Sequence, residues 1–81
     1  MAKRLFVVAD VFTIFHFGRG LTPEPRLGPG QVHVGDAIEL RRPDGTSATT
    51  TIKATGSYPL VFVIPLEIAA EEIPPGTEAW T

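Results

Sequence analysis

From Gly18 onward, glycine and proline recur at short intervals and divide the chain into segments of at most ten residues, which is shorter than an average helix. There are eight glycines and eight prolines among 81 residues, and they stand between apolar runs. Such punctuation is typical of turns. The runs themselves are rich in valine, isoleucine, phenylalanine and threonine, which suit a pleated, half-buried surface. The chain is therefore predicted to be all-β.

Size and composition predict one small globular domain spanning residues 1–81. The apolar fraction is 43% and the charged fraction is 20%, which excludes the highly charged composition of a disordered chain. The formal net charge of −2 gives no overall excess of the cations that neutralise phosphates. Because there are no cysteines, a disulfide framework, a thiolate zinc site and a cysteine nucleophile are excluded.

The first residues, "MAKRLFVVADVF", place two basic side chains before an apolar run. Asp10 breaks that run and no small-residue cleavage site follows it, so we do not expect a signal peptide. No apolar stretch reaches the ~18 residues that a membrane-spanning helix needs. The expected location is the cytoplasm, without a membrane partner.

The N-terminal part of the chain predicts one long strand followed by a loop. Residues 5–15 favour a strand that is interrupted near Ala9 and Asp10. Residues 16–31 contain four glycines and three prolines. Pro23 and Pro25 lack the amide that a central strand needs, so 16–31 is predicted to be a long Gly/Pro-rich loop or a ragged edge.

The rest of the chain predicts a hairpin and two further strands. Residues 37–54 alternate around a Pro43-Asp44-Gly45 turn, in which proline presets φ and glycine takes the left-handed position. A buried strand at Leu60–Ile64, at most one helical turn at 69–73 and a closing strand at 77–81 follow. About six short strands separated by turns indicate a small antiparallel β-barrel.

Three blocks of the sequence resemble the second domain of elongation factor Tu and related translational GTPases. The blocks are "DVFTIFHFGRG", "VHVGDAIEL" and "EEIPPGTEAW", in the family's order and spacing. The resemblance implies a six-stranded, closed, Greek-key-like barrel, present here as a free-standing domain.

The chain also departs from that family. After Gly20 the prolines of "LTPEPRLGPG" replace a β-branched strand, and the family's Ala-Gly-x-x-V-G segment is missing. No tRNA-binding residue is therefore carried over from that segment. The chain contains no G-x-x-x-x-G-K-[ST] phosphate loop, so we expect no binding or hydrolysis of a nucleoside triphosphate.

The most suggestive functional residues are those of the segment after the first strand. An aromatic side chain beside a cation can stack on a base while the cation faces a phosphate, and His16-Phe17 before Gly18-Arg19 provides that arrangement. The bland alternative is a glycine-rich turn with a solvated arginine. The candidate binding residues are Phe17, Gly18, Arg19, Gly20 and Arg26.

The sequence contains no residue pattern typical of a catalytic site or a metal site. His16 and His33 lack a chelating spacing, and metal sites usually need three or four ligands. The carboxylates have no predicted pocket that would shift a pKa, and no serine stands in a triad-like grouping. We therefore expect no enzyme, no catalytic residue, no metal and no cofactor.

Two kinds of function stay open. The first is a non-enzymatic binding module for RNA, the ribosome or a translation-related protein, as the family resemblance implies. The second is an assembly module that forms a homo-oligomer or pairs with another protein. It would use a strand edge left open by the prolines of 22–29, because an exposed edge can accept a partner strand.

Overall fold

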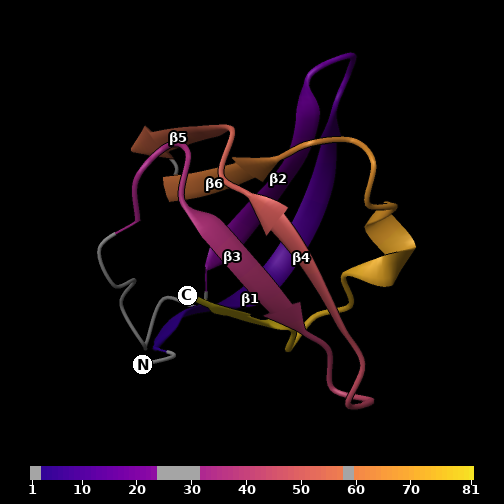
Figure 1. Ribbon diagram of the computed structural model, residues 1–81. Helices are drawn as coiled ribbons and strands as arrows, with labels where there is room; N and C mark the ends of the chain where they lie inside the picture. The colour runs from indigo at the N-terminus through magenta and orange to yellow at the C-terminus, as the bar shows by residue number, and fades with distance from the viewer. Residues whose placement is uncertain (1–2, 24–31, 58–59) are drawn as a thin grey trace.

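The fold is a single antiparallel sheet that turns back over its own core. The computed structural model describes residues 3–23, 32–57 and 60–81. Within them lie seven strands and one short 3-10 helix (Figure 1): β1 Arg4–Ile14, β2 Gly18–Pro23, β3 Ala37–Arg41, β4 Ser47–Thr51, β5 Ala54–Ser57, β6 Leu60–Ile64, η1 Ala70–Glu72 and β7 Glu78–Trp80. The strand order is β4-β3-β7-β1-β2-β6-β5, and every pair is antiparallel.

Strand β1 belongs to both halves of the sheet. Its first residues pair with β7, from Arg4 opposite Trp80 to Val7 opposite Glu78. Its later residues pair with β2, and the register shifts between Val8 and Asp10. The predicted interruption near Ala9 and Asp10 is confirmed as this irregularity. Such a bulge increases local twist, which helps one long strand pass from one half of the sheet to the other.

The core lies between the two halves. Phe6 of β1 stacks on Phe62 of β6, with ring centroids 4.5 Å apart. Leu21, Leu40, Ile52, Ile64 and Ile73 are among the fully buried side chains around this pair. The alternation within β3, where Ile38 and Leu40 are buried, matches a strand with one wet face. The all-β prediction and the hairpin of β3 and β4 are confirmed.

The predicted loop at 16–31 is wrong for residues 18–23, although His16 and Phe17 do lie in a turn. Gly18–Pro23 forms β2, which lies between β1 and β6 rather than at an edge. Pro23 is compatible with this position because it is the last residue of β2, beyond the Leu21–Phe62 pair that ends the β6 ladder. At the assembly edge predicted at 22–29, Thr22 and Pro23 pair with β1, whereas the ladder to β6 ends at Leu21, so the open edge stays a prediction. Residues 24–31 lie outside the described part.

The strand pairing differs from the predicted six-stranded closed barrel in the number of strands and in closure. Seven strands occur within the described residues, because Ile52 and Lys53 separate β4 from β5. The amide of Ile52 donates to the carbonyl of Asp36 (2.9 Å), whereas the amide of Lys53 donates to the carbonyl of Val63 (2.7 Å). The chain thus leaves β3 and joins β6 at this point. By ladder pairing, β4 and β5 are the two ends of an open sheet.

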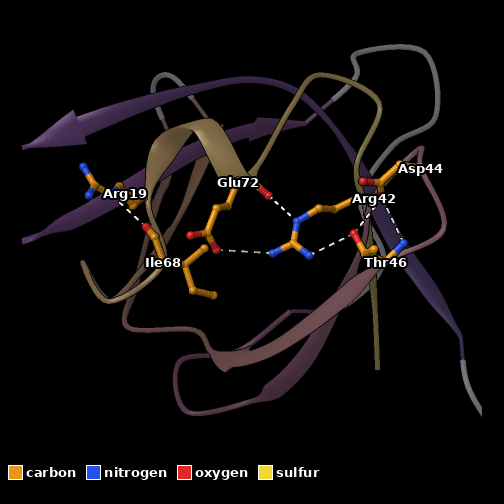
Figure 2. A network of polar contacts seen from close by, with 6 residues as sticks. All are labelled: Arg19, Arg42, Asp44, Thr46, Ile68 and Glu72. Carbon is orange, nitrogen blue, oxygen red and sulfur yellow. Dashed lines mark hydrogen bonds and ion pairs between the residues drawn. The ribbon is translucent and has the colours of Figure 1, made fainter.

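Two arginines hold the segment between β6 and β7 against the sheet (Figure 2). Arg19 Nε donates to the carbonyl of Ile68 (2.9 Å), and Arg42 Nε donates to the carbonyl of Glu72 (2.5 Å). Arg42 also donates to the hydroxyl of Thr46 (3.1 Å) and pairs with the Glu72 carboxylate (3.5 Å). Since charge-assisted hydrogen bonds are stronger than neutral ones, these contacts position the short helix η1.

The turn between β3 and β4 contains a carboxylate that should make its stability depend on pH. The hydroxyl and amide of Thr46 both donate to Asp44 Oδ1 (2.6 and 2.9 Å). These bonds, the hydroxyl first, hold the pKa of Asp44 below its ordinary value of 3.8. A depressed carboxyl pKa contributes stability at neutral pH, and that contribution is lost as the pH falls through the folded-state value.

Replacing Asp44 with asparagine is therefore expected to lower the urea midpoint at pH 7, and this effect should shrink as the pH falls below about 4, the ordinary carboxyl value, and on through the lower folded-state pKa of Asp44. Urea denaturation of both proteins across this pH range measures the difference. A gap between the two proteins that stays constant with pH would contradict the ionic origin of the contribution.

Candidate interaction site at the β1–β2 hairpin

The β1–β2 hairpin extends beyond the rest of the sheet (Figure 1). Its turn contains three residues with large side chains. Phe15, His16 and Phe17 form the turn, and the amide of Phe17 donates to the carbonyl of Ile14 (2.9 Å). His16 has a φ of 60°, a left-handed conformation that few residues other than glycine adopt. Because residues with uncommon backbone conformations cluster at functional sites, the turn is a candidate for a functional role.

The turn exposes aromatic surface that the core does not use. The side chain of Phe15 is 82% exposed, that of Phe17 is 40% exposed, and His16 is exposed as well. The rings of Phe15 and His16 lie with centroids 3.9 Å apart. A cluster of exposed aromatic side chains is a feature of interaction sites.

A cation from a distant part of the chain completes the cluster. Lys53 Nζ donates to the carbonyl of Phe17 (2.5 Å) and lies 4.4 Å from the centroid of the Phe17 ring. This distance is within the range of a cation–π interaction. We call Phe15, His16, Phe17 and Lys53 the aromatic tip.

Phe12 extends the aromatic surface along the hairpin. It lies opposite Gly20 in the ladder, and Gly20 in turn lies opposite Val63 of β6. A Cβ atom on Gly20 would meet the Phe12 ring, so the ring lies directly over this glycine. Phe12 is nevertheless 43% exposed, and the hairpin therefore presents aromatic surface on its strands as well as at its turn.

The structure separates the residues that the sequence had grouped together. Phe17 is part of the aromatic tip. Gly18 and Gly20 are buried within β2, where they allow close approach of neighbouring atoms rather than a flexible turn. Arg19 is half-buried, and its guanidinium donates to Ile68 and to the hydroxyl of Thr13 (2.6 Å). Arg26 lies outside the described residues.

The described arginines do not gather into a basic face. Arg41 pairs with Glu39 (2.6 Å), and its guanidinium carbon lies 4.1 Å from the centroid of the Trp80 ring. Arg4 pairs with Glu78 (3.3 Å). Together with the bonds of Arg19 and Arg42, these contacts give each of the four arginines a structural partner.

Two members of the aromatic tip were missed by sequence reasoning. Phe15 was assigned to the end of the first strand, although the three consecutive bulky side chains before Gly18 cannot all enter one side of a sheet. That pattern could have indicated exposure. Lys53 carries no such signal, because it is 36 residues from Phe17 and only the fold brings the two together.

The described part of the chain was also compared with the requirements of a metal site and of a membrane-spanning helix. There, no group of three or more histidine, aspartate or glutamate side chains could hold a metal ion. Across the same residues, the structure contains no helix with the length and hydropathy of a membrane span. Comparison of the chain with protein-family models, with curated proteins and with solved structures gave no match.

Proposed function

We propose that this chain is a non-enzymatic binding module that holds single-stranded RNA at the aromatic tip. The observation that carries the proposal is the exposure of Phe15 and Phe17 beside Lys53. Phe15 offers a face on which a base can stack, and Lys53 offers a positive charge for the adjoining phosphate. Stacking of this kind contributes ~1–3 kcal/mol per base and tolerates any base sequence.

The charge of the molecule sets the expected strength of this binding. The net charge is −2, and the aromatic tip contains one lysine and one histidine. Neutralising one or two phosphates gives a shallow dependence of affinity on salt, with a slope of about −0.7 per phosphate for single strands. Stacking rather than charge is therefore expected to supply most of the affinity, and the contact should involve few nucleotides.

The resemblance to the second domain of elongation factor Tu motivates two further parts of the proposal, the closure of the barrel and the source of the RNA. The β4–β5 segment is proposed to act as one bent strand that links β3 to β6 and so completes a six-stranded barrel, like that of the second domain of elongation factor Tu, while the edge of β4 that faces away from β3 stays without a partner strand. The hydrogen bonds of Ile52 to Asp36 and of Lys53 to Val63 support this closure. By the same resemblance, the RNA is proposed to belong to the ribosome or another part of the translation apparatus, in the cytoplasm.

Fluorescence anisotropy with a labelled single-stranded RNA octamer tests the proposal. Phe15→Ser is expected to weaken binding by about 5-fold to 150-fold, the equivalent of one lost stacking contact. Val34→Ser is the matched control, since Val34 is also a well-exposed apolar side chain (62%) but lies outside the hairpin. Its affinity should equal that of the unchanged protein.

Two results would contradict the proposal. One is the absence of binding by the unchanged protein at protein concentrations of about 100 μM, where even weak stacking contacts should be seen. The other is equal affinity of the Phe15→Ser and Val34→Ser variants, which would place any RNA contact elsewhere on the molecule.

A further inference from the structure

Strand β4 forms one end of the sheet and has a strand on one side only. It pairs with β3 along its whole length, from Ala37 opposite Thr51 to Arg41 opposite Ser47, without a register shift. Among the strands described, no second one pairs with it. The edge of β4 that faces away from β3 therefore has main-chain groups able to accept another strand.

The hydrogen bonds at the two ends of β4 show which groups face that edge. Arg42 donates to Thr46 (2.8 Å) at one end, and Ile52 donates to Asp36 (2.9 Å) at the other. Hydrogen-bonded pairs alternate along an antiparallel ladder, so Ala48 and Thr50 bond to β3. The amides and carbonyls of Ser47, Thr49 and Thr51 consequently point away from β3, and the side chains of these three residues are exposed.

This edge lacks the features by which proteins usually prevent strand pairing. Natural edge strands contain charged side chains, prolines or bulges, whereas β4 reads "SATTT" and has a regular register. The charges beside it are paired within the molecule, Glu39 with Arg41 (2.6 Å) and Arg42 with Glu72 (3.5 Å). An approaching strand would therefore meet a neutral, β-branched surface.

We propose that β4 pairs with β4 of a second copy of this chain, antiparallel across a two-fold axis with Thr49 opposite Thr49. A two-fold interface must be complementary to itself, and a neutral strand satisfies this because no like charges face each other. Ser47 of each copy then lies opposite Thr51 of the other, and such Ser/Thr pairs across strands are favourable. The register forms about six main-chain hydrogen bonds.

The result is a continuous sheet that runs through both copies. One strand from each copy makes a small interface, so the dimer is expected to be transient, with a dissociation constant in roughly the micromolar range or weaker. The β4 edge shares no residue with the aromatic tip. The dimer therefore does not depend on RNA binding, and either property can fail while the other holds.

Sedimentation velocity from about 10 μM to about 1 mM protein covers the range in which a weak dimer forms. The unchanged protein should shift from monomer towards dimer. Thr49→Lys and Thr49→Glu should each stay monomeric, because identical charges then meet on the two-fold axis. An equimolar mixture of these two variants should recover the dimer, because lysine and glutamate attract each other across the same axis.

Thr55→Lys is the matched control, since Thr55 is an exposed threonine on β5 at the other end of the sheet. It should dimerise like the unchanged protein. Circular dichroism of each variant verifies that the sheet is retained. The proposal is overturned if the unchanged protein stays monomeric throughout, if either Thr49 variant still dimerises alone, if the mixture stays monomeric, or if Thr55→Lys abolishes the dimer.

Discussion

Replacing Phe62 with alanine is expected to lower the free energy of unfolding by about 3–5 kcal/mol. Phe62 is 4% exposed and stacks on Phe6 with centroids 4.5 Å apart and an interplanar angle of 23°. The two rings come from β6 and β1 and join the halves of the sheet across the core. Their loss removes buried apolar surface and leaves a cavity that the surrounding strands cannot fill.

Such a loss is large for a chain of this size. At roughly 0.05–0.15 kcal/mol per residue, the whole domain is stable by about 4–12 kcal/mol, so Phe62→Ala removes about a quarter or more of the total. Urea denaturation followed by the fluorescence of Trp80, the single tryptophan, measures it. Phe15→Ala deletes the same ring at an exposed position and should change the stability by less than about 0.5 kcal/mol. Equal losses in the two variants would contradict the assignment of the core.

Replacing Gly18 with alanine is expected to cost about 1–3 kcal/mol, although the change adds a single methyl group. An added Cβ would meet the carbonyl oxygen of Ile64 and would lie 2.7 Å from Cγ1 of Val63. Both belong to β6, which pairs with β2 and cannot move away without disturbing that ladder. The methyl group therefore separates two strands in the middle of the sheet.

Gly20→Ala is the matched control for Gly18→Ala. Its Cβ would meet the ring of Phe12, which is 43% exposed and can turn outward without moving the main chain. The expected loss is under about 1 kcal/mol, as for changes that a flexible side chain absorbs. Thermal or urea denaturation of both variants ranks them, and a larger loss for Gly20→Ala would show that β6 does not constrain Gly18.

Turns were predictable because their chemistry is local. In the Pro43-Asp44-Gly45 turn, Gly45 has a φ of 92° and Asp44 accepts the amide of Thr46, as its residue types predict. Gly35 has a φ of 95° at the entry to β3, a conformation that glycine adopts without steric cost. Each of these conformations is decided by residues within three or four positions along the chain.

Strand β2 was not predictable in the same way. Its two glycines and its proline all disfavour a strand when the segment is taken alone. In the folded protein, Gly18 lies where β6 leaves no room for a side chain, and Gly20 lies beneath the Phe12 ring. Both neighbours come from other strands, so the preference of the segment is overridden by contacts that local sequence does not contain.

The candidate site also contains residues that local sequence predicted and residues whose contacts only the fold decided. Phe17 was selected from its position before Gly18-Arg19 and is 40% exposed, and its binding role stays a prediction. Arg19 was selected for the same reason, but its guanidinium donates to Ile68, 49 residues away. A charged side chain beside an aromatic one in sequence is therefore not enough to assign a binding role, because the fold decides which groups it meets.

The amino-acid sequence by itself determined the all-β class, the β3–β4 hairpin with its turn, the buried strand β6 and the short helical turn at η1. These follow from alternation, β-branched residues and turn residues, which act over a few neighbouring positions. Only the tertiary structure decided that β2 lies between β1 and β6, that Lys53 meets Phe17, and that β4 ends the sheet. These depend on pairing between residues far apart in the chain, where the energy comes from contacts that form only once the strands have come together.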